Sequence, residues 1–174
     1  MTRARKEWWA SVAKRRDEHL IKLLKANVPW REFEEVIRAQ EKELMREART
    51  PAERLHIQRL SMPVLITEAY ARRLKWAEFG PLLRRCQRLG FADITHRIEV
   101  ACCFVQALPS FPEKAPQAFA MLDGVEQTLK RIRKSHYLRR EGMQGIAHAR
   151  AVAASAGLKP DWKRSPGNAG QRSA

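Results

Sequence analysis

The sequence contains no uninterrupted run of about 18 apolar residues, which argues against a membrane-spanning helix. Its basic first residues are also not followed by an apolar segment before Lys14, Arg15 and Arg16, which argues against a secretory signal peptide. We therefore expect a cytoplasmic protein.

The short motifs of several common enzyme classes are also missing. The sequence has no Walker phosphate-binding loop, no GxSxG nucleophile elbow, no HExxH zinc pair and no CxxC pair. Isolated carboxylates on helical segments, such as Asp93 and Glu126, are usually solvated surface groups. We expect a protein that is not an enzyme and needs no cofactor.

One pattern of histidines and glutamates resembles the ligand spacing of metal-binding helical bundles. Glu53 precedes His56 by three residues, and His96 precedes Glu99 by three. A di-metal carboxylate site needs two further glutamates in the same bundle core, and the apolar faces supply none. We predict no metal site.

Cysteine is scarce, with only Cys86, Cys102 and Cys103 in the chain. Three cysteines cannot all pair within one chain, and a bridge between the neighbours Cys102 and Cys103 would be strained. Both neighbours lie in an apolar run, where a thiol usually packs as a small hydrophobe. We expect reduced thiols without a chemical role.

Acidic residues are too few to balance the basic ones. The chain has 34 Lys and Arg against 19 Asp and Glu, a formal net charge of +15, and its sequence pI is about 10.6. Such a charge attracts polyanions such as nucleic acid or acidic proteins. Hydrophobic residues still make up 44% of the 174 residues, which suffices for one folded core.

Apolar residues recur at three- and four-residue steps along most of the chain, and no strand-like alternation is sustained. We predict an all-α fold, a compact bundle of about seven short-to-medium helices forming one domain over residues 1–157. A disordered basic tail is expected over residues 158–174, which have little to bury. The expected helices span about 5–26, 30–46, 51–75, 82–89, 94–108, 119–132 and 137–156.

Local signals place several helix ends. Thr50, Pro51 and Glu53 form the pattern of a capping box with proline in the first turn, so a helix should begin at Pro51. Asn27 tolerates the left-handed conformation that ends a helix, and Gly90 should close another. Asp93 can cap the helix that follows.

Two further proline sites suggest interruptions. Gly80 followed by Pro81 predicts a break between helices, and the segment 61–63, which ends in Pro63, predicts a restart or a kink. The segment from Ile98 to Leu108 is the most apolar, so its helix should lie innermost.

The densest group of basic residues follows the sixth expected helix. In a helix followed by a turn, these side chains could reach successive phosphates, the contact that gives nucleic-acid binding its salt dependence. We predict nucleic acid, DNA or RNA, as the partner, with phosphate contacts from Lys130, Arg131, Arg133, Lys134, Arg139 and Arg140.

The same charge admits a different partner. An immunity protein, antitoxin or adaptor could use a basic helical surface to cover an acidic protein. Such an interface should surround a buried aromatic or arginine centre with basic residues, whereas a phosphate track should spread them along a groove.

Residues 20–38 partly match a DNA-binding helix-turn-helix, with Asn27 at the turn position. Leu23 stands where a small residue is usual, and Glu32, Glu34 and Glu35 would lie against phosphate. An ordinary helical hairpin is the alternative there.

Overall fold

The computed structural model describes residues 3–158, in which all regular structure is helical. The α-helices are α1 (Arg3–Ala26), α2 (Trp30–Glu47), α3 (Pro51–Ala71), α4 (Trp76–Leu89), α5 (Ile94–Ala107), α6 (Ala115–Lys130) and α7 (Tyr137–Ser155). Two short 3-10 helices, η1 (Leu108–Ser110) and η2 (Pro112–Lys114), connect α5 to α6. The predicted all-α bundle of seven helices is confirmed over these residues. None of the helices within residues 3–158 is long and apolar enough to cross a membrane.

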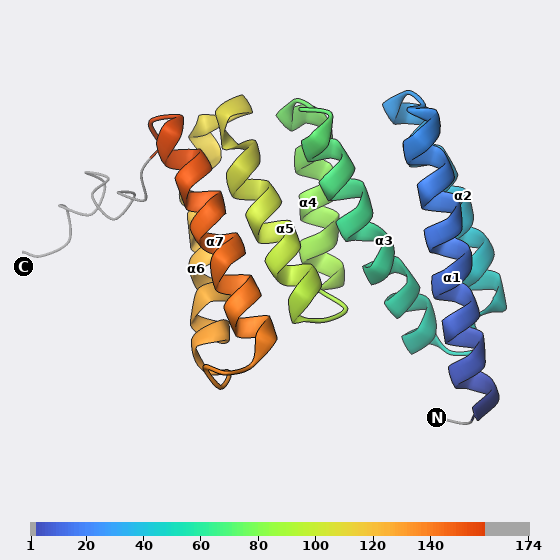
Figure 1. The fold of residues 1–174 in the computed structure, drawn as a ribbon. Coiled ribbons are helices and arrows are strands. Elements are labelled where there is room, and N and C mark those ends of the chain that lie inside the picture. Colours follow the sequence, from blue (N-terminus) through green and yellow to red (C-terminus); the bar gives the residue numbers. More distant parts are fainter. Residues whose placement is uncertain (1–2, 159–174) are drawn as a thin grey trace, which may run out of the picture.

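The helices form two layers (Figure 1). Helices α1, α3, α5 and α7 lie in front, and α2, α4 and α6 lie behind them. The main contacts join helices that are close in the chain: α2 packs on α3, α3 on α4 and α5, and α5 on α6 and α7. The fold is therefore a row of helical hairpins in chain order.

Most of the predicted helix ends are confirmed. Thr50 Oγ1 accepts a hydrogen bond from the Glu53 amide, and Glu53 Oε2 accepts one from the Thr50 amide, both at 3.2 Å, so the capping box forms. Asp93 accepts from the amide of His96 and caps α5. Asn27 has a φ of 48° and Gly90 a φ of 73°, the left-handed geometry expected at both positions.

The predicted break at Gly80 and Pro81 is wrong, because both residues lie inside α4. The chain turns earlier, after Ala71, where Arg73 adopts a φ of 54° and the Leu74 amide donates to the Ala69 carbonyl. Gly80 serves close packing instead, since a Cβ there would lie 2.8 Å from Cε2 of Trp76. Of the restart or kink predicted at 61–63, the restart is wrong, because Pro63 lies within one continuous α3.

Helix α5 is the centre of the main core, as its apolar sequence predicted. Its residues from Val100 to Val105 are all buried, and it contacts α3, α6 and α7. Phe104 packs with three aromatic rings from neighbouring segments, Trp76, Phe79 and Phe111, at centroid distances of 5.9 to 6.3 Å. The three cysteines are buried free thiols within this core, as expected.

The predicted tail, residues 158–174, lies outside the described residues except for Leu158. Leu158 packs against the main core, and its amide donates to the Ala153 carbonyl at 2.9 Å. Gly157 before it has a φ of 75°, so these two residues complete the end of α7.

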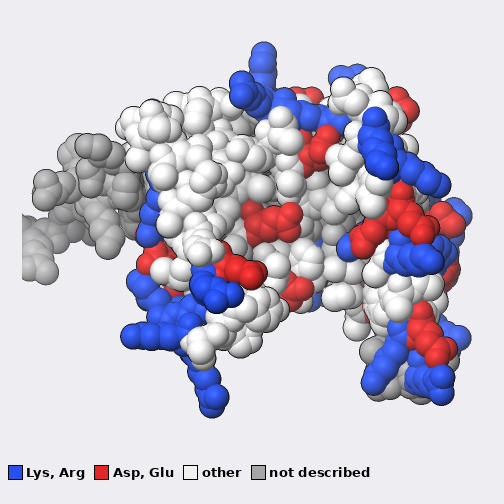
Figure 2. Space-filling view, in the orientation of Figure 1, with Lys and Arg blue, Asp and Glu red and all other residues white. Residues whose placement is uncertain are grey.

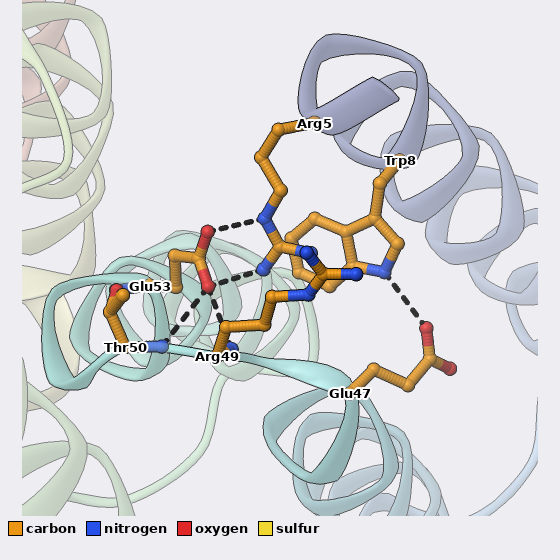
Figure 3. A network of polar contacts seen from close by, with 6 residues as sticks. All are labelled: Arg5, Trp8, Glu47, Arg49, Thr50 and Glu53. Atoms are coloured by element: carbon orange, nitrogen blue, oxygen red, sulfur yellow. Dashed lines mark hydrogen bonds and ion pairs between the residues drawn. The ribbon is translucent and has the colours of Figure 1, made fainter. Parts of the chain in front are cut away.

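Helix α1 has its own small apolar cluster and a polar attachment. Val12 packs with Leu44, Ala48 and Ile57 of the α2–α3 region, apart from the main core. At its N-terminal end, Arg5 reaches across to Glu53, as Figure 3 shows. Leu23 of the same helix belongs to the main core and Leu20 packs against it, so α1 is held by apolar contacts at both clusters as well as by ion pairs.

Candidate nucleic-acid interface

All six basic residues predicted to contact phosphate lie at one hairpin end. Helix α6 ends at Lys130 and α7 begins at Tyr137, so residues 130–140 form an exposed connection, here called the basic turn. Figure 2 shows Lys and Arg side chains gathered at the lower left, over the end of the α6–α7 hairpin. The sequence cluster is therefore also a cluster in space.

The hairpin is held by close packing of α7 against its neighbours. Gly142 is a point of close approach, because a Cβ there would lie 2.7 Å from Leu129 Cδ1 and 3.1 Å from Ile98 Cδ1. Leu129 and Ile146 are buried beside it. These contacts place the start of α7 firmly beside the end of α6.

Two of the six basic residues are occupied by contacts within the protein. Lys130 Nζ lies 2.7 Å from Glu126 Oε1, one helical turn away. Arg139 Nη1 donates to the backbone carbonyls of Lys130 at 3.2 Å and Ile132 at 2.8 Å, which satisfies the free end of α6. Lys130 and Arg139 therefore stabilise the turn and are less available to bind a partner.

The other four basic residues remain available to a partner. Arg131, Arg133, Lys134 and Arg140 are all exposed, and none makes an ion pair with a carboxylate within residues 3–158. The nearby carboxylate of Glu126 is already bound by Lys130 and by Arg150, whose Nη2 lies 2.5 Å from Glu126 Oε2. Hydrogen bonds from Lys130 and Arg150 lower the pKa of Glu126, so it stays ionised without neutralising the four.

An aromatic pair completes the turn. Tyr137 is 59% exposed, and its ring stacks on His136 with the centroids 4.9 Å apart. His136 is fixed in turn, because its Nδ1 accepts a hydrogen bond from the Leu138 amide at 3.2 Å. A flat ring thus lies exposed among free cations, an arrangement suited to stacking with a base or packing in a protein interface.

Several arginines outside the basic turn are neutralised by carboxylates. Arg5 pairs with Glu53, Arg72 with Glu68 at 2.6 Å, and Arg85 with Glu41 at 2.7 Å. On the face shown in Figure 2, cations over α1 and α2 alternate with acidic side chains, and a broad uncharged area covers much of the rest. The positive charge on this face forms separate groups, of which the basic turn is one.

The other sequence patterns are engaged in structural contacts. Glu53 belongs to the α3 capping box, Glu99 accepts a hydrogen bond from Thr67, and His96 lies 2.9 Å from Asp93. Within the described part of the chain, no three His, Cys, Asp or Glu side chains are grouped as metal ligands. In the helix-turn-helix pattern, Glu32 and Glu35 are exposed on α2, where phosphate would have to approach.

Comparison of the chain with protein families, with curated proteins and with solved structures finds no match. The geometry of the basic turn therefore carries the functional argument.

Proposed function

We propose that this protein binds nucleic acid through the basic turn, without catalysis. The observation that carries the proposal is a set of four exposed cations at one hairpin end, none of them paired with a carboxylate of residues 3–158: Arg131, Arg133, Lys134 and Arg140. Phosphate contacts of this kind supply affinity without reading sequence. Lys130 and Arg139, included in the sequence prediction, would act mainly by shaping the turn.

The test measures binding of a labelled 20-nucleotide strand and of a duplex to the full chain at several salt concentrations. Four phosphate contacts should weaken duplex binding about 100-fold between roughly 50 and 200 mM salt. Reversing the four cations together, as R131E/R133E/K134E/R140E, should abolish most of the affinity for the duplex.

A matched control separates the turn from net charge. The variant K22E/K25E/K42E/R46E makes the same change in total charge at four exposed residues of α1 and α2. It should bind nearly as well as the unaltered chain. Equal losses in both variants, or no dependence on salt, would remove the basis of the proposal.

An acidic protein partner is the second candidate, favoured by the exposed ring of Tyr137 amid the four cations. A protein interface typically places an aromatic anchor at its centre, with charged residues around it. Purifying the chain from its native cells and identifying what accompanies it, nucleic acid or one acidic protein, distinguishes the candidates. An acidic protein whose binding is lost in Y137A would favour the second.

A further inference from the structure

A second positively charged site lies between two helices that the basic turn does not include. A groove of about 420 Å³ separates α2 from α4, and four arginines line it: Arg31, Arg38, Arg85 and Arg88. Two carboxylates, Glu34 and Glu78, also line the groove. With Glu41, which pairs with Arg85, three carboxylates lie against the four arginines, so the groove keeps a small excess of positive charge and favours an anion.

Two of these arginines are held in place by carboxylates. Arg85 Nη2 donates to Glu41 Oε1 at 2.7 Å, and Glu41 is only 4% exposed, so this anchor is buried beside the groove. Arg38 Nη2 donates to Glu34 Oε1 at 3.0 Å, one helical turn away. Guanidinium groups fixed in this way lose little freedom when they bind a further anion.

Donor capacity remains after these pairs form. Arg38 Nη1 is buried and has no hydrogen-bond partner among the described residues. Arg31 and Arg88 are exposed, and neither pairs with a carboxylate within residues 3–158. Glu41 Oε2 is likewise buried without a partner among the described residues. Buried polar atoms in folded proteins are nearly always satisfied, so a ligand that accepts from Arg38 and donates to Glu41 would complete both.

The groove also has an aromatic wall. Trp30, the first residue of α2, lines it and is half-buried. The indole ring is nearly parallel to Phe33, with centroids 6.1 Å apart and an interplanar angle of 22°, so it is supported from the core side. A supported indole beside arginines can stack with a nucleobase while the arginines bind phosphate.

We infer that the α2–α4 groove is a nucleotide-binding site, in which arginines hold a phosphate and Trp30 stacks on the base. Its volume lies within the range of about 300–1,000 Å³ usual for small-ligand sites, and suits one nucleotide unit. The unit could be a free nucleotide or one link of a single strand, since both present the same phosphate and base. This site does not depend on the basic turn.

The test uses the full chain carrying R131E/R133E/K134E/R140E, so that binding at the basic turn does not contribute. Calorimetric titrations with adenosine monophosphate, a labelled pentanucleotide and inorganic phosphate are made at about 50 mM salt, where phosphate contacts are strong. We expect nucleotide binding, weakened at least tenfold by adding R31E/R88E. Adding K22E/K25E, an equal charge change on α1, should leave it within about twofold.

Replacing Trp30 tests the base contact. W30L should weaken nucleotide binding about tenfold, a change expected from losing one stacked base, while phosphate binding stays the same. W30F should restore much of the loss, and thermal unfolding of each variant shows whether it is folded. If only the pentanucleotide binds, the natural ligand of the groove is a single strand. If adenosine monophosphate binds as well, the groove also accepts a free nucleotide.

Two results would overturn the inference. One is the absence of binding by both nucleotide ligands to the chain with the altered turn. The other is binding that R31E/R88E leaves unchanged. Either result would leave the proposal for the basic turn intact, because that proposal depends on how much binding is lost when the turn itself is altered.

Discussion

The guanidinium of Arg5 pairs with the same carboxylate, Glu53, that closes the capping box of α3 (Figure 3). Arg5 also lies over the ring of Trp8, 3.5 Å from its centroid, and Trp8 Nε1 donates to Glu47 at 3.0 Å. One carboxylate therefore both starts α3 and attaches α1 to it.

This double role predicts a dependence of stability on acid. The bond from Arg5, with those from the backbone amides of Arg49 and Thr50, lowers the pKa of Glu53 to about 2 from its usual value of 4.5. A carboxylate with a lowered folded-state pKa stabilises the protein above its unfolded pKa, and this contribution is lost as pH falls through the folded value. The melting temperature of E53Q should therefore lie below that of the unaltered chain at pH 7.

The gap between the two melting temperatures should narrow between about pH 4.5 and pH 2, the interval set by the two pKa values. Thermal unfolding at each pH, monitored by circular dichroism, measures this gap. A gap that stays constant down to pH 2 would show that the ionised carboxylate contributes nothing.

Gly142 and Gly145 on α7 form a matched pair for close packing. A methyl group at Gly142 would meet Leu129 and Ile98, at 2.7 and 3.1 Å, whereas at Gly145 it would meet only Cys102 Sγ, at 3.7 Å. G142A should cost about 1–2 kcal/mol of unfolding free energy, because overpacking outweighs the gain in helix propensity. G145A should be neutral or add up to about 1 kcal/mol. Urea unfolding checks both, and equal effects would contradict the close approach.

Arg139 and Arg140 are neighbours with different expected roles. Arg139 donates to two backbone carbonyls at the end of α6, so R139A should lower the unfolding free energy by about 1–2 kcal/mol. Arg140 is exposed, so R140A should leave stability unchanged and reduce the salt dependence of duplex binding by about one phosphate contact. Denaturant unfolding and binding at varied salt separate the two effects. A stability loss in R140A equal to that in R139A would contradict this division.

The three buried thiols should resist modification in the folded protein. Burial raises the pKa values of Cys86 and Cys102 to about 11 and that of Cys103 to about 12, so few thiolates exist near pH 8. An aromatic disulfide reagent should react with all three in denaturant and at least a hundred times more slowly without it. Fast reaction of any one thiol in the native protein would show that it is accessible.

Helix ends that depend only on residues close by in the sequence could be predicted from the sequence. The Thr50–Glu53 capping box and the stop at Gly90 are local, and both formed as expected. The end of α3 was missed because Arg73 occupies a left-handed position that usually requires glycine or asparagine. Gly80 suggested a break because the sequence does not show that Trp76 packs against its backbone.

The candidate sites also combine features that the local sequence shows with features that only the folded structure brings together. The cluster at 130–140 was visible as consecutive basic residues, and the i, i+4 spacing of Glu126 and Lys130 could have revealed that Lys130 is paired. The carbonyl contacts of Arg139 depend on how the turn closes. The α2–α4 groove joins residues as distant as Trp30 and Arg88, so it arises only when the helices pack.

The row of hairpins in chain order has a consequence for how the chain folds as it is made. Each hairpin finds most of its apolar partners in residues already synthesised or soon to follow, so assembly can advance from the N-terminus without distant segments meeting first. Helix α1 depends on two neighbours, because Val12 packs with Leu44 of α2 and also with Ile57 of α3. Its cluster is therefore expected to be complete only after α3 has formed.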